Sequence, residues 1–281
     1  MGRLDIFRAD PSAGSLYSAL VAEAGVEKQL GLAYGPHRLH RADVFEARRG
    51  AERPLPSVLF FPGGGWRRAN RGSYAFVGAA LAAAGVTTIV ADYRQFPEVR
   101  FPAFCEDAAL AYAWAVRRQR VGASRGLIVA GHSAGAHIAA LIALDRRYLE
   151  AAEAGLPRPL GLIGLAGPYA FDPTTWPSTK DIFAGLANPD RARPVTFVDT
   201  SAPPALVMHG TSDRTVMLHN QRELVEAMIQ ADVPIAAHEF IGLGHVGLAL
   251  ALSRPFRWRA PVRAEMLRFV DMIARTAAAL A

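Results

Sequence analysis

Short apolar runs bounded by turn residues recur along the chain, and most are apolar at nearly every position. Runs of this length, apolar throughout, predict strands buried on both faces, as in a parallel sheet. The run at 41–47 is weaker, because apolar and polar residues alternate in it. The continuous runs lie at 56–61, 86–92, 126–131, 160–165, 204–209 and 236–241.

Between these runs the apolar residues take a helical spacing. Strands that alternate with helices indicate βαβ units. We therefore predict an α/β fold with a mostly parallel, doubly wound sheet and helices on both faces. No internal repeat or low-complexity linker divides the sequence, so we expect one domain over 1–281. The expected helices cover 73–84, 103–118, 133–144, 215–230 and 261–280.

The first residues, 1–38, are expected to form a helical or extended lead-in to this domain. Asp5 and Asp10 stand where the apolar core of a secretory signal would begin, so we see no signal peptide. The single cysteine, Cys105, allows no disulfide within the chain and fits a cytoplasmic location, which we therefore predict. A short amphipathic helix is expected where Leu16, Leu20, Val21 and Ala24 recur.

One stretch, 167–204, interrupts the alternation of strands and helices. It is rich in Pro, Asp and Thr, and it carries Tyr169 and Trp176 among its aromatic residues. Long segments of this kind in a compact domain are usually functional. We expect it to be an insertion that rims a substrate pocket.

Composition and charge exclude several classes of partner. The chain is 51% hydrophobic, yet no apolar run approaches the roughly 18 residues of a membrane-spanning helix. The net charge is +6, but the arginines are scattered and no nucleic-acid-binding module accompanies them. We therefore predict neither a membrane nor a nucleic-acid partner, and the sequence does not reveal the oligomeric state.

The sharpest chemical signal is Gly131-His132-Ser133-Ala134-Gly135, placed between a buried strand and an apolar helix. This is the G-x-S-x-G nucleophile elbow in the structural context that it requires. The serine lies on a tight turn, and small neighbours let the strand and helix approach each other. Ser133 is therefore the predicted nucleophile.

A second signal is Pro62-Gly63-Gly64-Gly65-Trp66, directly after a predicted strand. Consecutive glycines leave backbone N–H groups uncovered, and a tetrahedral intermediate needs such donors for its oxyanion. We expect the N–H groups of Gly64, Gly65 and Ala134 to form this oxyanion hole. The substrate itself is expected to contact Trp66, Tyr169 and Trp176.

Asp213 follows the strand run at 204–209, and His245 follows the last strand run. The chain order Ser133, Asp213, His245 is that of an α/β-hydrolase triad. His245 would serve as general base, and Asp213 would orient its imidazole. Other acids on the predicted insertion follow no strand so directly; they are Asp172, Asp181 and Asp199.

The remaining histidines, including His132, His137 and His209, are interpreted as structural. No set of His, Cys, Asp and Glu shows metal-ligand spacing, so no metal is expected. Dinucleotide and phosphate-loop fingerprints are absent as well, and we predict no cofactor.

With these motifs in place, the chain resembles the acetyl-esterase and hormone-sensitive-lipase-like group of α/β-hydrolases. It is similar in particular to bifunctional feruloyl and acetyl-xylan esterase-like and isoprenylcysteine methylesterase-like proteins. The resemblance rests on 62–66, 91–114, 131–140, 164–169, 209–216 and 244–247. It implies a serine carboxylesterase that acts on small carboxylic esters through an acyl-enzyme.

The resemblance departs at Pro62, where the family usually has a histidine that anchors the glycine loop. Proline fixes its own backbone angle, so rigidity could hold this loop instead. Two alternatives to esterase activity stay open at this stage. One is an amidase such as a formamidase, which would use the same three residues. The other is a catalytically inactive binding protein on the same fold.

Overall fold

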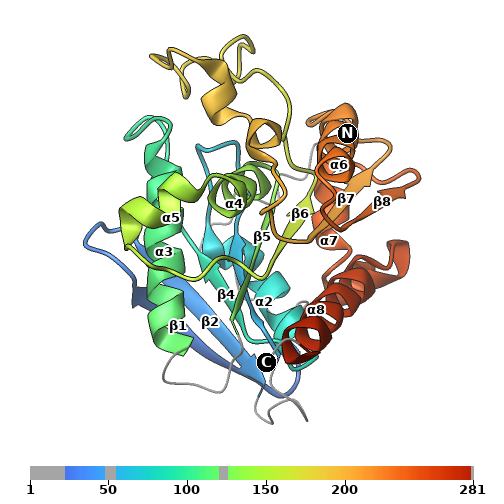
Figure 1. Ribbon diagram of the computed structural model, residues 1–281. Coiled ribbons are helices and arrows are strands. Elements are labelled where there is room, and N and C mark those ends of the chain that lie inside the picture. The colour runs from blue at the N-terminus through green and yellow to red at the C-terminus, as the bar shows by residue number, and fades with distance from the viewer. Residues whose placement is uncertain (1–22, 48–54, 120–125, 280–281) are drawn as a thin grey trace, which may run out of the picture.

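The computed structural model describes residues 23–47, 55–119 and 126–279, which fold around one eight-stranded sheet (Figure 1). The strand order is β1-β2-β4-β3-β5-β6-β7-β8. From β4 to β8 all pairings are parallel, and β2 joins β4 antiparallel. The strands are β1 Val26–Ala33, β2 Arg41–Ala47, β3 Ser57–Phe61, β4 Thr88–Ala91, β5 Leu127–His132, β6 Gly161–Leu165, β7 Ala205–Gly210 and β8 Ile235–Phe240.

The predicted mostly parallel sheet is confirmed, and each apolar run contributes its strand. The run at 236–241 was wrongly expected to be buried on both faces, because it forms the edge strand β8, whose residues are exposed or half-buried. Sequence analysis placed no separate strand at β1. This edge strand pairs antiparallel with β2, and most of its residues are exposed or half-buried. Without a buried face it has no apolar pattern to reveal it. Most of the amphipathic helix expected around residues 16–24 lies outside the described residues.

Helices cover both faces of the sheet (Figure 1). One apolar cluster contains buried side chains of α3, α4, α5 and α6, and a second contains those of α2, α7 and α8. Of the described helices, none is long and apolar enough to cross a membrane. Their bounds are α2 Ala75–Ala82, α3 Ala103–Gln119, α4 Ala134–Leu144, α5 Arg146–Ala152, α6 His219–Gln230, α7 His245–Leu250 and α8 Val262–Ala279.

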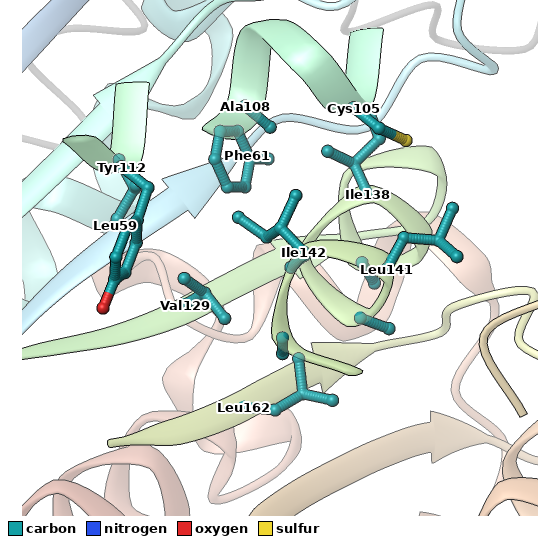
Figure 2. Packing of buried hydrophobic residues seen from close by; sticks show 14 of the residues in the cluster. Leu59, Phe61, Cys105, Ala108, Tyr112, Val129, Ile138, Leu141, Ile142 and Leu162 are labelled. Carbon is teal, nitrogen blue, oxygen red and sulfur yellow. The ribbon is translucent and has the colours of Figure 1, made fainter. Parts of the chain in front are cut away.

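Strand β3 explains why the core forms two layers. Val58 and Phe60 belong to one apolar cluster, and Leu59 and Phe61 belong to the other. Successive side chains of a strand point to opposite faces, so a fully apolar strand serves both. Figure 2 shows Leu59 and Phe61 of β3 on the side of the sheet that α4 and α3 cover. There they pack near Ile138 and Ile142 of α4 and Ala108 and Tyr112 of α3.

The chain order along the sheet places the loops that carry the chemistry together. From β3 the chain first adds β4 on one side, and then β5 pairs with β3 on the other side. The order of the strands therefore reverses at β3. In open α/β sheets, ligands bind outside the carboxyl ends of the strands at such a switch point. The glycine-rich segment follows β3, and Ser133 follows β5.

Candidate active site

Ser133 occupies a sharp turn between β5 and α4, with φ 55° and ψ −123°. A non-glycine residue rarely adopts a positive φ, and it persists only where its surroundings enforce it. A hydrogen bond from Ser133 N to the Leu165 carbonyl oxygen, at 2.8 Å, holds the turn against β6. A Cβ atom at Gly135 would lie 1.9 Å from the Phe61 carbonyl oxygen. Only glycine therefore lets α4 begin this close to β3.

The structure brings the three residues of the predicted triad together. The Ser133 hydroxyl lies 2.8 Å from His245 Nε2, and His245 Nδ1 lies 2.7 Å from Asp213 Oδ2. Asp213 belongs to the loop after β7, and His245 is the first residue of α7, after β8. The side chain of Asp213 is fully buried, and that of His245 is 13% exposed. This is the geometry in which the imidazole can take the serine proton while the carboxylate fixes its tautomer.

The carboxylate of Asp213 is held by several donors. Its Oδ1 accepts hydrogen bonds from the backbone N–H groups of Thr215 and Val216, at 2.8 and 3.0 Å. Burial acts to raise the pKa of Asp213, but hydrogen bonds from His209 and His245 outweigh it and keep this pKa below the usual range. Asp213 therefore stays charged opposite His245. His209, expected to be structural, is 3.3 Å from this carboxylate.

His132 connects the nucleophile turn to His245. Its Nε2 donates to the carbonyl oxygen of His245 at 3.1 Å, and its Nδ1 accepts from the Tyr74 hydroxyl at 2.7 Å. The two imidazole rings lie 4.7 Å apart, centroid to centroid. Burial, reinforced by the charge of His245, lowers the pKa of His132 to about 3. His132 is therefore neutral at physiological pH, and its hydrogen bond fixes the backbone that carries the general base.

The glycine loop after β3 leaves backbone donors without partners. The Gly64 carbonyl oxygen accepts from Arg67 N and Arg68 N, both at 3.1 Å. Within the described part of the chain, no hydrogen bond uses the N–H groups of Gly64 or Gly65. Ala134 is the first residue of α4, where helix geometry also leaves the N–H free.

The structure shows what holds this loop at Pro62. The Tyr93 hydroxyl donates to the Pro62 carbonyl oxygen at 2.8 Å, and Tyr93 is fully buried. Gly63 lies against the nucleophile turn, since a Cβ atom there would be 2.8 Å from His132 Nδ1 and from the Tyr74 hydroxyl. The loop is therefore held by a buried tyrosine at Pro62 and packs closely against the nucleophile turn at Gly63.

A cavity of about 600 Å³ opens over Ser133 and His245. This size suits a small-molecule ligand. Trp66 and Trp176, both expected to contact substrate, line it, and so do Gly64 and Gly65. The lining residues from the stretch 167–204 are Pro168, Phe171, Trp176, Ser178 and Thr179. Those from the segment before α6 and from its first turn are Thr215, Val216, Met217, His219 and Asn220.

Tyr169, also expected to bind substrate, does not line the cavity. It is 1% exposed and lies in the core. Its ring fills the space beside Gly164 and Gly167. A Cβ atom added to Gly164 would lie 1.9 Å from the Tyr169 hydroxyl, and one added to Gly167 would lie 2.4 Å from the Tyr169 ring. The physical reason is packing: the aromatic ring closes the gap left by two residues without side chains, so it offers no surface to a ligand.

Two buried polar residues that sequence reasoning did not assign to the site anchor the stretch 167–204. Asn220, at the start of α6, accepts hydrogen bonds from Ala170 N and Phe171 N, both at 3.0 Å. His137 of α4 contacts the Ala192 carbonyl oxygen through Nε2, at 2.7 Å. His137 also packs edge-on against Trp66, with centroids 5.1 Å apart. The sequence signal that could have revealed the role of His137 is its position as the polar residue on an otherwise apolar helix.

Among the described residues, no group of His, Cys, Asp and Glu is arranged to hold a metal ion. The acids considered as alternatives to Asp213 have other partners. Asp172 accepts hydrogen bonds from Thr174, and Asp199 accepts them from Ser201. For Asp181 the described hydrogen bond is at its backbone carbonyl oxygen, which accepts from Arg100, and no described bond joins its carboxylate to His245. His245 pairs with Asp213.

Residues 58–249 match a protein family described as alpha/beta hydrolase fold. The match covers most of the chain, and the chain belongs to this family. By homology it falls among the carboxylic ester hydrolases, and the resemblance identified from the motifs is confirmed.

Two curated relatives illustrate the similarity. Esterase LipC of Mycobacterium tuberculosis is 29% identical over 83% of this chain and 67% of its own length. A probable isoprenylcysteine alpha-carbonyl methylesterase of Oryza sativa subsp. japonica is 32% identical over 42% of this chain and 28% of its own length. The chain therefore spans from about a quarter to about two thirds of these relatives.

Among solved structures, esterase B of Lactobacillus rhamnosis is similar, with a TM-score of 0.77 and 17% identity. The alignment covers 95% of this chain and 92% of the other. At this identity the likeness establishes the fold alone.

Proposed function

We propose that this protein is a serine carboxylesterase that hydrolyses small carboxylic esters through an acyl-enzyme on Ser133. The observation that carries the proposal is the hydrogen-bonded line Ser133–His245–Asp213, of which Ser133 and His245 line the cavity. Similarity to curated esterases supports the same reaction class. The predicted cytoplasmic location and the predicted lack of a cofactor stay predictions.

In this mechanism His245 Nε2 takes the proton of the Ser133 hydroxyl as the oxygen attacks the ester carbonyl. The N–H groups of Gly64, Gly65 and Ala134 stabilise the oxyanion, because they have no other partner within the described residues. His245 then gives its proton to the leaving alcohol. Water, activated by the same imidazole, releases the acid from Ser133.

The test compares two substrates that share one acyl group: an ester of that acid, and the amide in which an amine of the same shape replaces the alcohol. We expect kcat/KM to be much higher for the ester, because alcohols leave a tetrahedral intermediate more readily than amines. The measurement is steady-state turnover of a short-chain aryl ester and the matching anilide. Faster cleavage of the anilide would replace the esterase proposal by the amidase alternative, and turnover of neither would favour the binding-protein alternative.

We further propose that the stretch 167–204 limits the size of the substrate, with Trp176 as the decisive side chain. Trp176 lines the cavity and is 50% exposed, so its ring takes space that a longer acyl or alcohol chain would need. Trp176→Ala should raise the ratio of kcat/KM for a hexanoyl ester over an acetyl ester by at least about tenfold, because hexanoyl is four methylenes longer and a single methylene in a pocket is already worth that much. A series of aryl esters of increasing acyl length measures it.

The matched control is Trp258→Ala, since Trp258 is 83% exposed and does not line the cavity. This variant should leave the chain-length profile unchanged. A half-exposed ring also predicts a small loss of stability for Trp176→Ala, well below the roughly 3–5 kcal/mol of a buried tryptophan. A Trp176→Ala enzyme with the wild-type profile and a much lower melting temperature would contradict the assignment.

A further inference from the structure

The described lining of the cavity over Ser133 includes two arginines and no acid. Arg67 and Arg68 both line it. No aspartate or glutamate is among its lining residues in the described part of the chain. A cleft lined by one sign of charge concentrates ligands of the opposite sign.

These two arginines differ from others near the site, which are paired with acids. Arg71 bonds Asp43 and Asp92, and Arg94 bonds Asp107. Within the described residues, Arg67 and Arg68 form no ion pair with a carboxylate. Their charge is therefore available to a bound molecule.

The guanidinium of Arg67 is held in place by groups that leave its charge unbalanced. Its Cζ lies 4.2 Å from the centroid of the Phe96 ring, and its Nη2 lies 3.5 Å from the Ser178 carbonyl oxygen. Stacking on a ring orients the fork of donors without consuming them. Ser178 belongs to the stretch 167–204, so Arg67 bridges the glycine loop and the rim of the cavity.

The backbone that carries both arginines is tied to the proposed oxyanion hole. Arg67 N and Arg68 N share the Gly64 carbonyl oxygen, and Phe96 N donates to the Trp66 carbonyl oxygen at 2.9 Å. Arg67 and Arg68 therefore follow the glycine donors at a fixed position, separated from them only by Trp66. A ligand whose ester carbonyl meets these donors brings its remaining groups into reach of the arginine side chains.

We propose that the protein prefers esters that carry a second, free carboxylate, which Arg67 and Arg68 bind while the apolar part rests on Trp66, Phe171 and Trp176. This inference rests on the proposed esterase function and names its substrate class. Paired hydrogen bonds from a guanidinium to a carboxylate are among the stronger polar contacts in proteins. The carboxylate thus adds affinity at the same cavity in which the ester reacts.

The experiment uses pairs of esters that differ only in charge. Para-acetoxybenzoate and para-acetoxybenzamide place the charge on the alcohol side, and phenyl hydrogen adipate and its terminal amide place it on the acyl side. The quantity measured is the ratio of kcat/KM for the anionic ester over its neutral partner. Comparing this ratio between wild type and variants cancels both the intrinsic reactivity of each ester and any general loss of activity.

The variants are Arg67→Gln, Arg68→Gln and the double variant. Arg254→Gln is the matched control, because Arg254 is exposed and outside the cavity. We expect the double variant to lower the ratio about tenfold or more for at least one pair, with no change in the control. Added salt should lower the wild-type ratio as well, because it screens exposed charges.

A double-variant ratio within twofold of wild type for both pairs would overturn the preference for anionic esters. If removing Arg67 disturbs the loop, Arg68→Gln alone still tests whether the cavity prefers anionic esters. Arg68 is exposed, and its side chain makes no hydrogen bond within the described residues, so this variant should keep the fold. Failure of the esterase function would look different: the wild type would then hydrolyse none of the neutral esters either.

Discussion

Replacing Ser133 by alanine should lower kcat for an ester on the order of 10⁶-fold, the loss typical of a missing triad nucleophile. The hydroxyl makes one described hydrogen bond, to His245 Nε2, and the side chain is nearly buried without being part of an apolar cluster. The melting temperature should therefore hardly change. Steady-state kinetics and a thermal melt of the same preparation measure both.

Ser178→Ala is the matched control for this result. Ser178 lines the same cavity but lies outside the Ser133–His245–Asp213 line. Its kcat should stay within about tenfold of wild type. If Ser133→Ala kept activity within tenfold of wild type, the nucleophile assignment would be wrong.

His245 and Asp213 are expected to act with Ser133 as one unit. His245→Ala should approach the loss seen in Ser133→Ala, and Asp213→Asn should lower kcat about 10⁴-fold, because the amide favours the wrong imidazole tautomer. Combining either change with Ser133→Ala should add little, since the shared proton transfer is already lost. The measurement is kcat for the three single and two double variants.

Asp172→Asn provides the control acid, because Asp172 caps the backbone at Thr174 instead of contacting His245. Near-full activity of Asp213→Asn together with a large loss in Asp172→Asn would show that the wrong acid had been chosen. Additive losses in the double variants would instead show that the residues do not act together.

The parts of the fold that sequence predicted are those encoded locally. Most runs that are apolar at nearly every position became strands buried on both faces, as β3 shows with Val58 and Leu59 on opposite sides. The nucleophile turn could be placed because one of its glycines is required by a contact within a few residues: a Cβ atom at Gly131 would meet the Gly135 backbone. The proximity of Ser133, Asp213 and His245 followed from loop position, since carboxyl ends of parallel strands share one edge.

The features that could not be predicted from the sequence are those that depend on contacts between distant segments. Nothing local distinguishes Tyr169, which fills a gap beside Gly164, from Trp176, which faces the cavity. His132 was interpreted only as structural, and nothing local revealed that it bonds the carbonyl oxygen of His245, more than a hundred positions away. The pairing that makes β1 an edge strand is likewise invisible in its own residues.

The most direct test of the central claim is to locate the nucleophile by mass spectrometry after reaction with a fluorophosphonate. This reagent forms a stable bond to an activated serine in the way that an acyl group forms a transient one. We expect one adduct per chain, on the peptide that contains Ser133, and none in His245→Ala under the same conditions. Absence of an adduct in the wild type, or an adduct on another serine such as Ser178, would contradict the proposed acyl-enzyme.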